Sequence, residues 1–282
     1  MTELPNLRPS PIAGLWYSGD REVLSKQVDD YLASAQIPQL NGEVVALIAP
    51  HAGLKFSGRT AAHAFRAVMG KSYDLVAVVA PFHAFHPATM ITSAHQAYSN
   101  PIGPVWIDQE AVSEVDRQLR QNIYQGLTPI ANDGEHSLEI ELPFLQRALA
   151  DPFKLLPIML RGRSSQVIKA LGQSLKDVFS KRRGLLVAST DLSHFYPQPV
   201  ADTLDNEMLN QIQAFSPEGV LNAERTGTGF ACGSAAVAAV MWAARELGAN
   251  AVELVHHSTS GDESGDYNSV VGYGAAIILK RP

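Results

Sequence analysis

Short apolar runs recur along the whole chain, and most of them lack the strict alternation of apolar and polar residues that a half-exposed strand would show. Strands that are apolar on both faces are typical of a central sheet covered by helices on both sides. The pattern predicts strands at residues 44–49, 75–80, 154–160, 185–189, 251–256 and 270–279.

The segments between these runs carry apolar residues at helical spacing. They lie at residues 21–35, 57–69, 164–180, 201–215 and 233–247. Strands that alternate with helices indicate an α/β fold. Because no repeat, low-complexity tract or linker interrupts the pattern, residues 1–282 are predicted to form a single three-layer domain, with helices flanking a mostly parallel or mixed sheet.

Composition narrows the class of protein. Hydrophobic residues make up 46% of the chain and charged residues 18%, which is typical of a globular protein with a large core. The net charge is −6 and the longest basic run is residues 181–183, so nucleic-acid binding is not expected. No apolar run reaches the ~18 residues of a membrane span, and the first 19 residues do not resemble a signal peptide. With a single cysteine the chain cannot form an internal disulfide, and a cytoplasmic location is expected.

Two of the predicted strands end in the same way. Each stops at Ala-Pro and is followed by a histidine, His51 in one case and His83 in the other. A third strand, at residues 185–189, is followed by Asp191 and His194. Ligands of open α/β sheets bind beyond the carboxyl ends of the strands, and imidazole is the commonest metal ligand in proteins. These side chains are therefore predicted to meet in one crevice, where the histidines could bind a metal.

The residues alone leave the remaining candidates open. Cys232 follows a glycine-rich stretch at the start of a predicted helix, where the helix dipole would lower the pKa of its thiol, but a single cysteine among Ala and Gly is more often a small buried residue. His136 lies near a predicted helix start, where it has either a pocket-lining or a purely structural role. Asp262 and Asp266 are expected in turns. The histidines expected to be structural are His63, His95, His256 and His257.

Seven motifs of this chain resemble those of the Memo family and occur in the same order as in that family. Its prokaryotic members are often named AmmeMemoRadiSam system protein B. The motifs are LRPSPIAGLWYSGDREVL, APHAGLKFSGRTAAHAF, APFHAFHP, EHSLEIELPFLQ, STDLSH, ACG and SGDESGDYNSVVGYGAA. This family is similar in fold to the catalytic subunit of class III extradiol ring-cleavage dioxygenases, which hold non-haem Fe(II). The resemblance therefore implies an α/β fold with a metal crevice at the strand ends.

Carried over position by position, the resemblance implies that His51, His83 and Cys232 bind the metal. It also implies that His194 transfers protons, that Asp191 orients His194 or balances its charge, and that His136 lines the pocket. Fe(II) is the expected metal, with Zn²⁺ or copper as alternatives because a thiolate is a soft ligand.

Two positions depart from the family pattern. Family members commonly carry Ser-His-His where this chain has Phe82-His83-Ala84, and His86 is the candidate to replace the lost histidine. An Arg usual in the family is replaced by Ser234, which removes a cation that could bind an anionic substrate.

Three functions fit the resemblance. The leading hypothesis is an oxidative, dioxygenase-like reaction on an unknown small molecule. The alternatives are a non-enzymatic adaptor that binds phosphopeptides and a Zn²⁺ hydrolase. The family name also implies a functional link to radical-SAM and AMMECR-type proteins, and an oligomer is compatible with the sequence.

Overall fold

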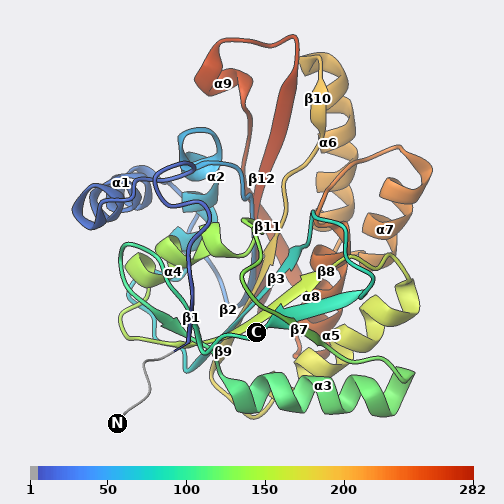
Figure 1. The fold of residues 1–282 in the computed structure, drawn as a ribbon. Coiled ribbons are helices and arrows are strands. Elements are labelled where there is room, and N and C mark those ends of the chain that lie inside the picture. Colours follow the sequence, from blue (N-terminus) through green and yellow to red (C-terminus); the bar gives the residue numbers. More distant parts are fainter. Residues whose placement is uncertain (1–5) are drawn as a thin grey trace.

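The chain folds around one mixed nine-stranded sheet (Figure 1). A computed structural model describes residues 6–282, so residues 1–5 of the predicted domain lie outside the described part. Four parallel strands form the middle of the sheet, in the order β2 (Glu43–Ala49), β9 (Gly184–Ser189), β3 (Leu75–Pro81) and β8 (Lys154–Leu160). The predicted α/β architecture with a mixed central sheet is confirmed.

Shorter or antiparallel strands extend the sheet on both sides. Next to β2 lies β12 (Val270–Lys280), which runs antiparallel to it and also pairs with β11 (Ala251–Thr259) and β10 (His194–Tyr196). Next to β8 lie β4 (Met90–Ser93) and then β7 (Thr128–Ile130). A separate three-stranded sheet consists of β1 (Leu7–Arg8), β5 (Ala97–Tyr98) and β6 (Val105–Trp106).

Helices cover both faces of the large sheet (Figure 1). One hydrophobic core joins the sheet to α3 (Gln109–Ile123), α5 (Ser165–Phe179), α6 (Gln198–Gln213), α7 (Pro217–Thr226) and α8 (Ser234–Glu246). The other core joins it to α1 (Arg21–Ser34), α2 (Leu54–Arg66), α4 (Leu142–Ala148) and the small sheet. The two remaining helical segments, η1 (Glu139–Glu141) and α9 (Gly261–Ser264), are short. No helix within residues 6–282 is both long and apolar enough to cross a membrane.

Successive residues of β3 explain why its sequence is apolar throughout. Leu75, Ala77 and Val79 belong to the first core, whereas Val76 and Val78 belong to the second. Since neighbouring side chains of a strand point to opposite faces, a strand covered on both sides must be apolar at every position.

Gly233 brings the start of α8 against the end of β9. A Cβ atom at this position would lie 2.3 Å from the carbonyl oxygen of Ser189, so no other residue allows the same approach of the two backbones. Cys232, which directly precedes this glycine, is held at the end of the sheet as a result.

Candidate metal centre

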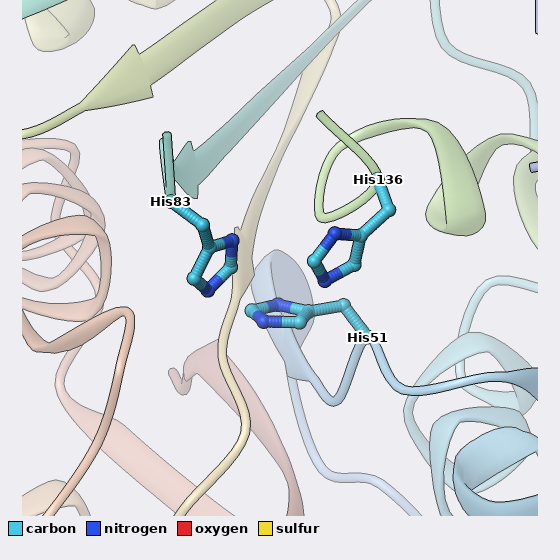
Figure 2. Close-up of side chains that lie close together, drawn as sticks. All are labelled: His51, His83 and His136. Atoms are coloured by element: carbon cyan, nitrogen blue, oxygen red, sulfur yellow. The ribbon is translucent and has the colours of Figure 1, made fainter. Parts of the chain in front are cut away.

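Three histidines converge at the carboxyl ends of the parallel strands (Figure 2). His51 follows β2, His83 follows β3, and His136 comes from the loop between β7 and η1. Each offers a ring nitrogen, and these nitrogens all lie within 4.8 Å of one another. The sequence predicted that His51 and His83 would meet, and the structure adds His136 to them.

The rings are packed against one another in a fixed arrangement. His83 and His136 are stacked, with ring centroids 4.8 Å apart and planes inclined by 11°. His51 meets both rings edge-on, at centroid distances of 5.4 Å and 5.5 Å. Two nitrogens bound at about 2.1 Å to one tetrahedral ion are about 3.4 Å apart, so a metal would have to draw the more distant nitrogens of the cluster together by about 1 Å.

Hydrogen bonds to Nδ1 orient two of these rings. The Nδ1 atom of His51 lies 2.8 Å from the hydroxyl of Ser189, the last residue of β9. The Nδ1 atom of His83 lies 3.0 Å from a carboxylate oxygen of Glu135. Because Nδ1 is engaged in both rings, Nε2 is the atom left to bind a metal, and such outer contacts raise the affinity of histidine ligands.

Electrostatics favour neutral imidazoles at two of the three positions. Burial, together with the nearby His136 and His83 rings, lowers the pKa of His51 well below its ordinary value. Burial also lowers the pKa of His136, to about 4. His83 differs: burial lowers its pKa, but the hydrogen bond to Glu135 and the negative charges of Glu135 and Asp191 together outweigh burial and raise it. A metal can therefore bind at neutral pH without displacing protons from His51 or His136.

Cys232 lies beside this cluster. Its Sγ atom is 3.2 Å from Nε2 of His51 and accepts a hydrogen bond from the backbone N–H of Asp191. A nitrogen bound at about 2.1 Å and a sulfur bound at about 2.3 Å lie about 3.1 Å apart when the angle between them at the ion is 90°. Nε2 of His51 and Sγ of Cys232 could therefore bind the same metal. The prediction that the helix dipole lowers the pKa of the Cys232 thiol is wrong, since burial and the Asp191 carboxylate raise this pKa.

Asp191 holds the loop after β2 in place. Its carboxylate accepts the backbone N–H of His51 at 2.7 Å, and burial raises its pKa to about 7. His194 is oriented differently from what the resemblance implied, because its Nδ1 atom bonds to the carbonyl oxygen of Leu192 and not to Asp191. Asp191 and His194 nevertheless line the same cavity as the three histidines.

The cavity above the cluster has a volume of about 710 Å³. Its wall is largely apolar and includes Phe56, Phe195 and Trp16, whose ring lies 4.1 Å from that of His136. Lys55, at the start of α2, and Asp266 add opposite charges to the lining. A small organic molecule would fit between the aromatic side chains and the histidines.

Neither departure from the family pattern adds a donor to the histidine cluster, although Phe82 and Ala84 flank His83. His86 accepts a hydrogen bond from the backbone N–H of Ala88 and packs edge-on against Phe82, so it does not replace a missing histidine. Ser234 bonds to Glu224 and lines a different cavity. The charge of the candidate pocket is therefore unaffected by the serine at position 234.

The other residues judged structural have contacts that account for them. Asp262 accepts the backbone N–H of Thr259 in the turn that precedes β12, and Asp266 accepts that of Asn268, although it also faces the pocket. Two contributors to the site were missed, Glu135 and Ser189. The only sequence signals were their positions, one beside His136 and the other at the end of a predicted strand.

A histidine cluster at the carboxyl ends of the parallel strands of a mixed sheet defines an α/β protein with a candidate mononuclear metal centre. Residues 8–277 match the family model described as Memo-like protein, so the chain belongs to the Memo family. A MEMO1 family protein of Nitrosopumilus maritimus is 32% identical over 97% of this chain and 100% of its own length. One of Methanopyrus kandleri is also 32% identical, over 97% and 99% of the two chains.

A solved structure supports the fold. An uncharacterized protein of Escherichia coli superposes with a TM-score of 0.52 at 11% identity, over 83% of this chain and 100% of its own. At this identity the likeness concerns the arrangement of strands and helices alone.

Proposed function

We propose that this Memo-family protein is a mononuclear metalloprotein that carries out a dioxygenase-like oxidation of a small organic molecule, with Fe(II) as its metal. The observation that carries the proposal is the convergence of His51, His83 and His136 beneath a cavity of about 710 Å³. Cys232 lies within reach as a further donor or as a replacement for His136.

The donor chemistry fits such a metal. The set contains imidazoles, two of them oriented through hydrogen bonds to Nδ1, together with a thiol that could ionise on binding. Non-haem Fe(II) sites commonly use two histidines and one anionic ligand and leave positions open for substrate and oxygen. Bound iron would supply the activation of O₂ that organic side chains cannot perform.

The protein's own groups would bind the substrate and move protons. The walls formed by Trp16, Phe56 and Phe195 would hold an apolar body and exclude water. His194 has Nδ1 bonded to the backbone, which leaves Nε2 to accept a proton from a substrate hydroxyl or return it. Burial lowers the pKa of His194, so the ring is neutral at pH 7 and can act as a base.

Metal content after competitive anaerobic reconstitution with Fe(II), Zn²⁺ and copper tests the proposal. We expect about one equivalent of iron in the wild type and its loss in His51→Ala and His83→Ala. Comparison of His136→Ala with Cys232→Ser then identifies the third ligand. Equal metal content in His51→Ala and wild type would refute the site, and a wild type that binds no metal would favour a non-enzymatic, ligand-binding role.

A Zn²⁺ hydrolase is the second candidate, because three histidines and an open position are also a ligand set of catalytic zinc. Turnover that proceeds equally well with and without O₂, in protein loaded with zinc, would favour this function. In either case we propose a cytoplasmic protein with a small-molecule substrate and a functional link to radical-SAM and AMMECR-type proteins.

A further inference from the structure

We infer that Glu135 is a positioning residue that fixes the orientation and the tautomer of His83 and His136 together. One carboxylate oxygen, Oε1, lies 3.0 Å from Nδ1 of His83 and 3.2 Å from Nδ1 of His136. The other, Oε2, accepts the backbone N–H of His83 at 2.5 Å. A single side chain thus contacts two members of the cluster, His83 and His136, and it lies 52 residues from the first of them along the chain.

The surroundings of Glu135 make its carboxylate an acceptor only. Besides the hydrogen bond with the His83 ring and the close contact with the His136 ring, it accepts the backbone N–H groups of His136 and Ser137 at 2.8 Å and 2.9 Å. The residue is 5% exposed, so these donors take the place of water. A carboxylate surrounded by donors attracts an N–H and repels a nitrogen lone pair.

This property selects one tautomer in both rings. A neutral imidazole carries its proton on either Nδ1 or Nε2, and the partner of one nitrogen decides which. With Nδ1 of each ring beside the same carboxylate oxygen, the proton belongs on Nδ1 in both. The two Nε2 lone pairs are then free at the same time, which a shared metal requires.

The backbone of Glu135 is fixed from the opposite side. Its N–H donates to the Asp133 carboxylate at 3.1 Å, and its carbonyl oxygen accepts from the buried Arg8 guanidinium at 2.6 Å. Glu139, a few residues further on, is equally buried, but its carboxylate bonds to Arg8 and Tyr17 and to no histidine. The chain therefore offers a matched control for the loss of a buried carboxylate.

Nitrogen NMR of the metal-free protein tests the tautomers directly. Long-range ¹H–¹⁵N spectra of histidine-labelled wild type, Glu135→Gln, Glu135→Ala and Glu139→Gln distinguish Nδ1–H from Nε2–H, and His83→Ala and His136→Ala assign the signals. We expect Nδ1–H on both rings in the wild type and in Glu139→Gln, and a change in at least one ring in Glu135→Ala. The Gln variant shows whether an amide oxygen can substitute as the acceptor. Unchanged tautomers in Glu135→Ala, or Nε2–H in the wild type, would overturn the inference.

Metal affinity tests the consequence, which rests on the proposed function. In a competition between the protein and a chromogenic chelator for Zn²⁺, Glu135→Ala is expected to bind about 10–100-fold more weakly than wild type, as is usual when such an outer contact is lost. Glu139→Gln should stay within about threefold, because it leaves the histidines untouched. If the tautomers depend on Glu135 but neither the wild type nor any variant binds metal, the proposed function fails and the positioning role stands. Equal affinities in Glu135→Ala and wild type would refute the role in binding.

Discussion

Replacement of Arg8 by methionine is expected to destabilise the protein by about 3–5 kcal/mol at pH 7, the usual penalty for removing one partner of a buried ion pair. The side chain of Arg8 is 1% exposed, and those of its partners Asp133 and Glu139 are 3% and 0% exposed. Its guanidinium donates to both carboxylates and to the carbonyl oxygen of Glu135. Methionine preserves most of the apolar volume but leaves these acceptors without a cation.

The size of the penalty can be worked out for Glu139, because this carboxyl group can avoid the uncompensated charge by taking up a proton. Burial already raises its pKa above the ordinary 4.5 despite the opposing effects of Arg8, Ser10 and Tyr17. At 1.36 kcal/mol per pKa unit, protonating a group of pKa 4.5 requires about 3.4 kcal/mol at pH 7 and about 0.7 kcal/mol at pH 5. The penalty of Arg8→Met should therefore fall between pH 7 and pH 5, by at most about 2–3 kcal/mol because the raised pKa of Glu139 in the wild type offsets part of the change.

Urea denaturation followed by circular dichroism at the two pH values measures this difference. A second substitution, Glu139→Gln in the Arg8→Met background, should recover about 1–3 kcal/mol at pH 7 and much less at pH 5, because it removes the stranded charge. A penalty that is the same at both pH values would refute the reasoning and would point to lost packing instead.

Three further outcomes are expected. Ser189→Ala removes the Nδ1 partner of His51 and should weaken Zn²⁺ binding about tenfold in the chelator competition. Burial and the stacked His63 ring lower the pKa of His256 to about 4, below the ordinary 6.5, so native stability falls as the pH falls from 6.5 to 4. His256→Gln should abolish this loss, which is at most about 3 kcal/mol, in urea denaturation across that range. Binding of Co²⁺ or Cu²⁺ should quench the fluorescence of Trp16, which packs against the cluster, and Trp16→Phe should remove the response.

Each of these outcomes has a control. Ser193→Ala is matched to Ser189→Ala, because within residues 6–282 the buried hydroxyl of Ser193 has no hydrogen-bond partner and should be dispensable. If the free energy of unfolding of His256→Gln falls with pH as steeply as that of the wild type, the expectation for His256 is contradicted. Quenching that persists in Trp16→Phe would instead assign the response to Trp106 or Trp242.

The sequence predicted those parts of the site that follow from strand geometry. His51 and His83 could be placed together because each follows a buried strand at Ala-Pro, and parallel strands of one sheet end at the same edge. The short strands β4 and β7 and the helix α7 were not predicted, since their apolar patterns are brief. Helix α3 was missed although Ala111, Val115 and Leu119 recur at helical spacing.

The rest of the site depends on tertiary packing that no local pattern encodes. His136 reaches the cluster because Arg8 and Asp133 hold its loop, and these contacts join residues more than 120 positions apart. The pKa of Cys232 was misjudged because burial outweighs the helix dipole, and burial is known only once the chain is folded. The resemblance to the family located Cys232 beside the cluster, which the spacing of residues could not do.

The donors around the crevice are widely separated along the chain, and this bears on when the protein could acquire the proposed metal. His51 and Cys232 are 181 residues apart, and His51 and Ser189 are 138 apart. A ribosome-bound chain that has just exposed His51 and His83 therefore lacks the sulfur and the hydroxyl that complete the pocket. The pocket proposed to bind a metal is therefore complete only after the synthesis and docking of the last third of the polypeptide. A half-made chain offers only scattered imidazoles, which bind ions weakly, so loading falls to the finished protein and to the metals then available in its compartment.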